Sequence, residues 1–169
     1  MANELSDLAQ IAIQEKRLQF DHFDSTMAWI VGNRLKEVAQ AQGQAVAIDI
    51  QLHGHPLFFY AMPGTTPDNV DWVRRKRNVV LRYHQSSYAI GLQLKQQNTN
   101  LTEKIGVDAC DYAPHGGCFP LMIKGTGCIG TITVSGLPQR EDHNLIVMVL
   151  AELLNQPLDE LALANPVAD

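Results

Sequence analysis

The chain has 169 residues, of which 46% are hydrophobic and 18% are charged, and its formal net charge is -5. A chain of this length supports one sizeable hydrophobic core, so residues 1–169 are expected to form a single domain. Its acidity argues against a nucleic-acid partner, because phosphate binding depends on clustered Lys and Arg. No apolar run approaches the roughly 20 residues of a membrane-spanning helix, so no membrane association is expected.

Two helices are predicted at the start of the chain. Residues 4–20 carry charges at helical spacing instead of the uncharged apolar stretch of a signal peptide, so a cytoplasmic location is expected. The second helix is predicted over 25–42, with Asp24 or Ser25 as its N-cap and Gly43 as its C-terminal stop. The second helix shows the apolar spacing of an element that buries one side.

The hydrophobic period then changes to two. Residues 45–52 alternate as in a half-buried strand, a turn follows at 53–56, and 57–62 form the returning strand. A helix is predicted over 67–84, because Thr66 is a favourable N-cap and a proline at the first helical position is tolerated. The first half of the chain therefore combines an antiparallel hairpin with helices.

The second half repeats this combination. A short helix is predicted over 87–97, residues 98–116 are mainly loop, and a hairpin of strands at 118–124 and 128–135 precedes a last helix at 139–155. The strands of this hairpin are apolar on both faces, which is typical of central strands covered on both sides. The pattern predicts an α/β (α+β) fold with helices above and below an antiparallel sheet.

The three cysteines, Cys110, Cys118 and Cys128, lack the paired short spacing of a zinc site. We expect reduced thiols and no disulfide between Cys118 and Cys128. The His-x-x-Cys spacing at 115–118 has no second pair, and His53 and His55 are a weaker signal still. No metal site is predicted.

A run of four basic residues lies in the helix at 67–84. Arg74 and Arg77 are predicted to point outward, whereas Lys76 falls in the middle of the apolar stripe with Arg75 on its flank. Burying an ammonium group is costly unless it is paired, so Lys76 needs an anionic partner. That partner is either a carboxylate such as Asp49, or the carboxylates or phosphates of a small ligand.

Three further positions are candidates for a site. His143 faces the core side of the last helix, either as a hydrogen-bonded core residue or as an iron ligand or proton-transfer group. The His-Gly-Gly run at 115–117 is either a strand-entry turn or a loop whose backbone N–H groups approach a ligand. Ser135 and Gly136, at a strand end, form either a plain turn or a pocket rim.

The segments GGCFPLMI at 116–123 and IGTITVSG at 129–136, followed by Asp142, resemble the signature of the haem-degrading-domain family. Lys76 matches the lysine in that family's helix, and the similarity spans about residues 43–154. The segments FFY, PGTTPDN and WVRRK between residues 58 and 76 are similar to an uncharacterised branch of the family. Other members include haem-binding regulators and glycolate-operon accessory proteins.

The resemblance implies a profilin-like, three-layer α/β/α sandwich with a five-stranded antiparallel sheet, assembled into a homo-oligomer. Four strands are clear from the pattern, and the fifth is expected within 98–116. The resemblance also suggests haem as a cofactor. Its propionates would suit Arg75 and Lys76, and its iron would be reached by His143 or His115.

Three functions remain open. The leading hypothesis is a small-molecule-binding module with its pocket near a subunit boundary. The second is an enzyme that uses His143 as acid or base and Lys76 as anion clamp, and the third is an oligomeric scaffold that uses the basic helix and the outward-facing Trp29. The candidate ligand-binding residues are Arg75, Lys76, His115, Gly116, Gly117, Ser135, Gly136 and His143.

Overall fold

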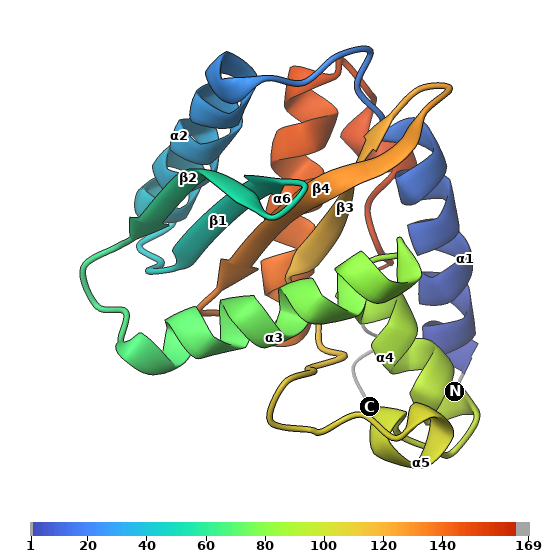
Figure 1. Ribbon diagram of the computed structural model, residues 1–169. Coiled ribbons are helices and arrows are strands. Elements are labelled where there is room, and N and C mark those ends of the chain that lie inside the picture. The colour runs from blue at the N-terminus through green and yellow to red at the C-terminus, as the bar shows by residue number, and fades with distance from the viewer. Residues whose placement is uncertain (1, 165–169) are drawn as a thin grey trace.

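The computed structural model describes residues 2–164 and arranges them as helices on both faces of one sheet (Figure 1). The helices are α1 (Ala2–Arg17), α2 (Ser25–Ala41), α3 (Pro67–Tyr83), α4 (Ser87–Gln96), α5 (Leu101–Ile105), α6 (Gln139–Leu153) and the 3-10 helix η1 (Leu158–Glu160). The strands are β1 (Ala47–Leu52), β2 (His55–Ala61), β3 (Cys118–Ile123) and β4 (Gly127–Ser135).

The sheet has the strand order β2-β1-β4-β3, and each neighbouring pair is antiparallel. The central strands β1 and β4 are therefore joined directly, although about 75 residues separate them in the chain. α2 and α6 pack on one face of the sheet, and α3 crosses the other face (Figure 1). This arrangement confirms the α+β class and the helices predicted above and below an antiparallel sheet.

The main core lies between the sheet and the pair α2 and α6. Its large, fully buried side chains come from both central strands, from β3 and from these two helices. They include Leu35, Ile48, Ile50, Phe119, Leu121, Ile132, Ile146 and Leu150. Burying such apolar surface supplies most of the favourable free energy of folding.

The predicted fifth strand is wrong for the described part of the chain. Residues 98–116 contain the short helix α5 and loops instead. Asn100 caps this helix, because its side-chain oxygen accepts a hydrogen bond from the Glu103 backbone N–H at 2.9 Å. Gly106, with a φ of 70°, ends it. These are local capping signals that favour a helical turn over a strand.

The outer edge of β3 is covered by one residue. Phe20 forms a single parallel bridge with Ile123. Its N–H donates to the carbonyl of Met122, and its carbonyl accepts from the N–H of Lys124, both at 2.9 Å. To make this contact, the chain leaves α1 at Arg17, earlier than the predicted end at residue 20.

The other boundaries follow the local signals closely. Asp24 caps α2 by accepting a hydrogen bond from the Met27 N–H at 2.9 Å. Thr66 and Asn69 form a capping box at the start of α3. The last helix ends at Leu153, two residues before the predicted end. Among residues 2–164, no helix combines the length and apolarity that crossing a bilayer requires.

Candidate functional site

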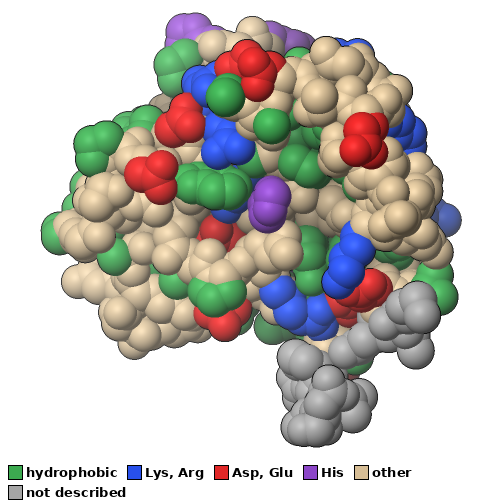
Figure 2. Space-filling view, turned by 90° about the horizontal axis from the view of Figure 1, so that it is seen from below, with side chains coloured by type: hydrophobic (Ala, Val, Ile, Leu, Met, Phe, Trp, Pro, Cys, Tyr) green, Lys and Arg blue, Asp and Glu red, His purple; other side chains and the backbone are tan. Residues whose placement is uncertain are grey.

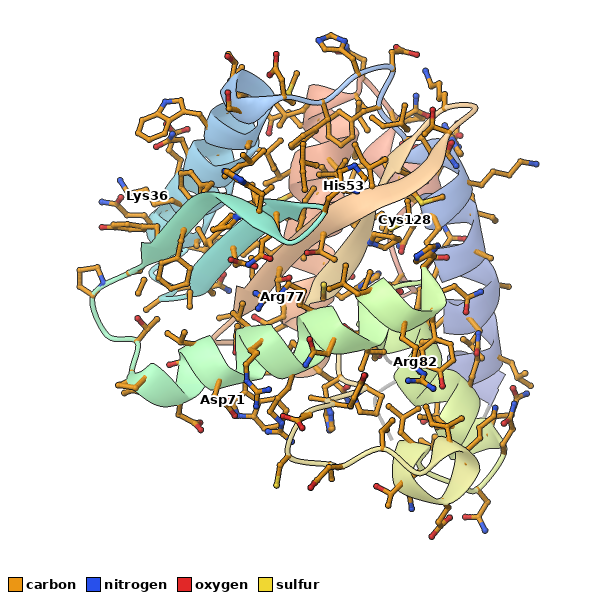
Figure 3. All side chains as sticks on the ribbon, viewed as in Figure 1. Lys36, His53, Asp71, Arg77, Arg82 and Cys128 are labelled. Carbon is orange, nitrogen blue, oxygen red and sulfur yellow. The ribbon has the colours of Figure 1, made fainter. Side chains whose placement is uncertain are left out.

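α3 turns two cations toward the sheet. Positions 73, 76, 77 and 80 follow the i, i+3, i+4, i+7 spacing of one helix face. Val73 and Val80 are buried there, and so is Lys76, which is only 3% exposed. Arg77 also reaches from α3 toward the strands (Figure 3), so its predicted outward direction is wrong.

Each cation is paired with a buried acid. The Lys76 Nζ lies 2.7 Å from Asp142 Oδ2 and also donates to the Val134 carbonyl at 3.2 Å. Arg77 lies 2.8 Å from Asp49 Oδ2. The predicted carboxylate partner of Lys76 therefore exists, but it is Asp142 of α6 and not Asp49, which β1 presents to the neighbouring arginine.

Asp142 connects three elements. Its second carboxylate oxygen accepts a hydrogen bond from the Leu137 N–H at 3.0 Å, in the turn between β4 and α6. Burial raises the pKa of Asp142, and the Lys76 ammonium opposes this shift. Because the two opposite charges neutralise each other, Lys76 no longer requires an anionic ligand.

The two glycines before β3 make room for this packing. Gly117 has a φ of 123°, and a Cβ added there would lie 2.6 Å from the Lys76 Nζ. A Cβ at Gly116 would collide with the carbonyl of Gln139 in the first turn of α6. In this structure the two glycines allow other segments of the same chain to pack closely against the start of β3.

A pocket of about 270 Å³ opens beside the ion pair, and we call it the Lys76 pocket. It lies where the first turns of α3 and α6 meet the end of β4. Its lining residues are Asp68, Asn69, Trp72, Lys76, His115, Ser135, Gly136, Leu137, Gln139 and Asp142. Seen from below α3, the surface is hollowed where hydrophobic, basic and acidic side chains meet (Figure 2).

Ser135 places a hydroxyl group at the wall of this pocket. The residue is only 4% exposed and lies at the end of β4, opposite Ala47 of β1. A hydroxyl group can donate one hydrogen bond and accept two. The Ser135 hydroxyl can therefore contact a molecule in the Lys76 pocket.

His115 forms the wall between the Lys76 pocket and a larger one. The second pocket has a volume of about 510 Å³, lies toward α1 and α4, and shares His115 and Gln139 with the first. The imidazole packs edge-on against Trp72, with 5.3 Å between ring centroids. Partial burial, and then the charges of Lys76 and Arg75, lower the pKa of His115, which favours a neutral ring.

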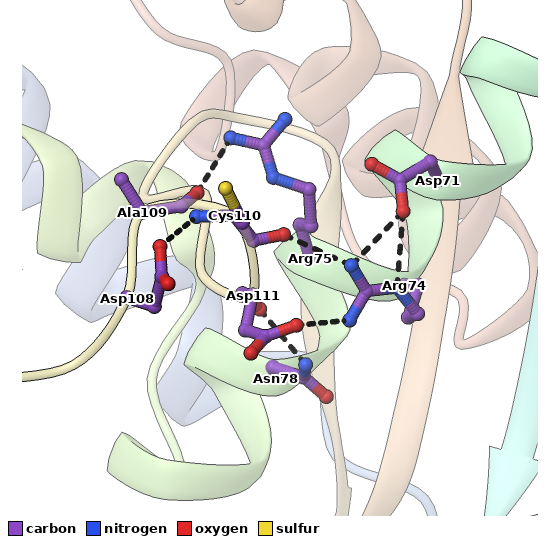
Figure 4. A network of polar contacts seen from close by, with 8 residues as sticks. All are labelled: Asp71, Arg74, Arg75, Asn78, Asp108, Ala109, Cys110 and Asp111. Carbon is purple, nitrogen blue, oxygen red and sulfur yellow. Dashed lines mark hydrogen bonds and ion pairs between the residues drawn. The ribbon is translucent and has the colours of Figure 1, made fainter.

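Arg75 lies outside both pockets and holds a loop. Its guanidinium sits over the Trp72 ring, 4.6 Å from the centroid, and donates to the Ala109 carbonyl at 2.8 Å. Arg74 and Asn78 bind the same loop through Asp111, as Figure 4 shows. The basic run of α3 thus fixes the 108–111 loop, which leads to the pocket residues Pro114 and His115.

His143 also lies outside both pockets. It is fully buried, with its ring between Tyr88 and Phe119. Its Nε2 lies 2.8 Å from the Gln14 side-chain oxygen, which can only accept, so Nε2 carries the proton. Burial lowers the pKa of His143 to about 3.

Of the eight candidate residues, four line the Lys76 pocket: Lys76, His115, Ser135 and Gly136. Gly117 touches the ion pair from behind, and Gly116 packs against α6. The sequence reasoning assigned no site role to Asn69, Trp72 or Gln139, which lie within the first two turns of α3 and α6. Asn69 and Trp72 entered it only as parts of segments that carry the family resemblance. The described residues contain no group of three or more His, Cys, Asp or Glu side chains placed to hold a metal ion.

The thiols agree with the sequence-based expectation, because all three cysteines are free. Cys118 lies opposite Thr133 in the sheet, and burial raises the pKa of its thiol to about 12. Cys110 is exposed on the loop shown in Figure 4. None of the three lines the Lys76 pocket.

Solved structures share this fold. The crystal structure of the yeast protein Ybr137w matches with a TM-score of 0.81 and 32% identity, over 88% of this chain and 87% of that one. The structure of HbpS matches with a TM-score of 0.62 and 20% identity over 80% of this chain and 92% of that chain. A PduOC:Heme complex matches with a TM-score of 0.59 and 17% identity over 72% of this chain and 87% of that chain.

Sequence comparisons agree with the structural ones. A UPF0303 protein of Azotobacter vinelandii is 57% identical over 159 residues, which are 94% of this chain and 96% of the relative. A UPF0303 protein of Rhizobium etli gives the same identity and coverage. The family model for the haem degrading protein HbpS-like family matches residues 23–151. The resemblance inferred from the motifs is thereby confirmed, and the chain belongs to the HbpS-like family.

Proposed function

We propose that the protein binds a small, overall neutral, polar molecule in the Lys76 pocket. The observation that carries this proposal is the Lys76 pocket itself, whose wall brings together the Ser135 hydroxyl and the amides of Asn69 and Gln139. At about 270 Å³ the pocket is close to the lower end of the range of about 300–1,000 Å³ typical of ligand sites. This size suits a molecule with a single ring.

The charges of the wall support a neutral ligand. Lys76 is neutralised by Asp142, and Asp68 adds a further carboxylate at the rim. An anion would therefore meet no unpaired cation, in contrast to the anionic ligand predicted from the sequence. The side-chain oxygens of Asn69 and Gln139 already accept hydrogen bonds from Thr66 and Gly116, so their amide nitrogens are the groups that face a ligand as donors, which favours a ligand with carbonyl or hydroxyl oxygens.

Haem does not fit the residues that the resemblance assigned to it. Lys76 is paired with Asp142, and Arg75 lines neither of the two pockets, so neither expected propionate partner offers an unpaired charge at the pocket wall. His143 is sealed in the core, which leaves His115 as the imidazole at the pocket wall. The haem in the PduOC complex is thus a property of that protein, and our proposal does not carry it over.

A reaction that uses His143 as acid or base has little support. A group with no access to solvent or to the pocket cannot exchange a proton with a substrate there. With a pKa lowered to about 3, this histidine is also neutral at physiological pH. We therefore propose binding and assign no chemical step.

The test uses Trp72 as a reporter. The chain has two tryptophans, so Trp29→Phe leaves the indole at the pocket wall as the sole tryptophan. We expect nicotinamide or uracil, both neutral one-ring amides, to change its fluorescence saturably, and we expect haemin not to compete with them. Ser135→Ala should weaken binding about 2- to 12-fold, the value of one hydrogen bond.

Ser6→Ala, at an exposed position on α1, is the matched control and should bind as the parent does. Native mass spectrometry of the purified protein extends the test to molecules that co-purify with it. The proposal fails if neither probe binds and no small molecule co-purifies. It also fails if the affinity of every bound molecule is unchanged by Ser135→Ala.

A further inference from the structure

A larger pocket lies beside the Lys76 pocket, on the other side of His115, and we call it the α4 pocket. Its volume of about 510 Å³ is within the range of about 300–1,000 Å³ typical of ligand sites. α4 contributes more lining residues to it than any other element, and α1, α6 and the loops that flank α5 complete the wall. Because both pockets are lined by His115 and Gln139, one molecule can extend from the first into the second.

The wall of the α4 pocket combines apolar side chains with charges that are already paired. Arg140 is paired with Asp7, which is only 2% exposed. Lys95 is paired with Glu4. An ion placed here would meet charges of both signs that already neutralise each other, so the wall favours a neutral, apolar group. The apolar side chains that such a group would contact are Tyr88, Leu92, Leu94 and Pro114.

The segment that separates the two pockets is held in place from both sides. On the α3 side, the Ala113 N–H donates a hydrogen bond to the Arg75 carbonyl at 3.1 Å. On the α4 side, Pro114 lies so close to the helix that a Cβ added at Gly91 would collide with the Pro114 carbonyl oxygen. A site whose walls are fixed by the fold loses less conformational entropy when a ligand binds. Both pockets are therefore formed before binding.

The two shared residues suit an uncharged linking group. The side-chain oxygen of Gln139 accepts a hydrogen bond from the Gly116 N–H at 3.3 Å, which leaves the Gln139 amide nitrogen to donate. The His115 ring packs edge-on against Trp72, and its lowered pKa keeps it neutral. A carbonyl group at the junction of the two pockets would therefore find a hydrogen-bond donor and no charge.

We propose that the ligand is a neutral two-part molecule, with a polar ring in the Lys76 pocket and an apolar group in the α4 pocket, joined through a carbonyl beside Gln139. This inference rests on the proposed function, because it adds a second subsite for the same ligand. Aromatic amides with an apolar substituent on the amide nitrogen have this composition. Burial of a phenyl-sized group in the α4 pocket should raise affinity roughly 10- to 100-fold over that of the ring alone.

The experiment compares nicotinamide with N-benzylnicotinamide, using the fluorescence of Trp72 in the Trp29→Phe protein. N-Benzylnicotinamide should bind at least about tenfold tighter. Thr99→Phe places a bulky side chain at the wall of the α4 pocket alone, so it should remove most of this gain and leave the affinity for nicotinamide unchanged. Thr102→Phe, at an exposed position on α5 that lines neither pocket, is the matched control and should keep the gain.

A crystal structure with N-benzylnicotinamide locates the phenyl ring without any variant and should show it in the α4 pocket. If nicotinamide binds but the benzyl compound binds no tighter, the second subsite is wrong and the Lys76 pocket stands as proposed. A gain that Thr99→Phe leaves intact, or a phenyl ring outside the α4 pocket, has the same meaning. If neither compound binds, the two-part ligand is overturned as well, and the proposed function then depends on uracil and on molecules that co-purify.

Discussion

At the scale of single residues, Gly117 illustrates how one backbone position permits the buried ion pair. Its positive φ disfavours any other residue, and the missing side chain leaves space for the Lys76 ammonium. Gly117→Ala should lower the free energy of unfolding by about 2–5 kcal/mol, as the sum of backbone strain and overpacking. Urea denaturation measures this loss.

Gly125→Ala is the matched control for that substitution. Gly125 also has a positive φ, of 75°, but a Cβ there would meet no atom within 4 Å. It should therefore show only the backbone cost, roughly 1–2 kcal/mol. Equal losses at the two glycines would mean that the space beside Lys76 is not filled as described.

His143 gives the protein a predicted sensitivity to acid. Burial lowers its pKa from 6.5 to about 3 in the folded state, so the unfolded chain takes up a proton first as the pH falls. The contribution of His143 to the free energy of unfolding is fully present above about pH 6.5. It declines toward pH 3, with a slope approaching 1.4 kcal/mol per pH unit.

Denaturation curves recorded at several pH values in this window measure the slope. His143→Gln removes the titrating group and should flatten the curve, whatever its effect on stability at neutral pH. His22→Gln, at an exposed position, should leave the slope as it is. If His143→Gln and the wild type lose stability in parallel, His143 is not held neutral by the fold.

At the scale of elements, the Lys76–Asp142 pair ties α3 to α6 across the end of the sheet. Lys76→Met would leave a buried carboxylate without its counter-charge and should cost about 3–5 kcal/mol. Lys76→Met combined with Asp142→Asn removes both charges and should recover part of that loss. The free energies of unfolding of the two single variants and the double variant form the required cycle.

Lys124→Met serves as the control for a surface pair. Lys124 contacts Asp21 at 2.9 Å, but both side chains are largely exposed, so its loss should change stability little. If removing Lys76 is as harmless as removing Lys124, the buried pair does not tie the two helices together.

Element boundaries were largely predictable because their signals are local. The Asp24 cap, the proline after Thr66 and the glycine turn at 125–127 each lie within a few residues of the boundary they set. The fifth strand was not predictable in this way. It was expected only from the resemblance, and the edge of β3 is instead bridged by Phe20, about 100 residues away in the chain.

At the scale of the whole molecule, the site depends on contacts that periodicity cannot reveal. The helical pattern predicted a buried Lys76 that needs an anionic partner and suggested Asp49, but it could not choose among the carboxylates of the chain. The correct one lies 66 positions away and is selected by how α3 and α6 meet beyond β4. Four of the eight residues predicted from the sequence line the pocket, and tertiary packing placed the other four elsewhere.

The central claim is that the Lys76 pocket holds a small polar ligand, and the most direct measurement is a crystal structure of the purified protein soaked with nicotinamide or uracil. The account predicts density for the ring in the pocket, with a polar atom within hydrogen-bond distance of the Ser135 hydroxyl. A pocket that contains only water bound to Ser135, after soaking with both compounds, would contradict it.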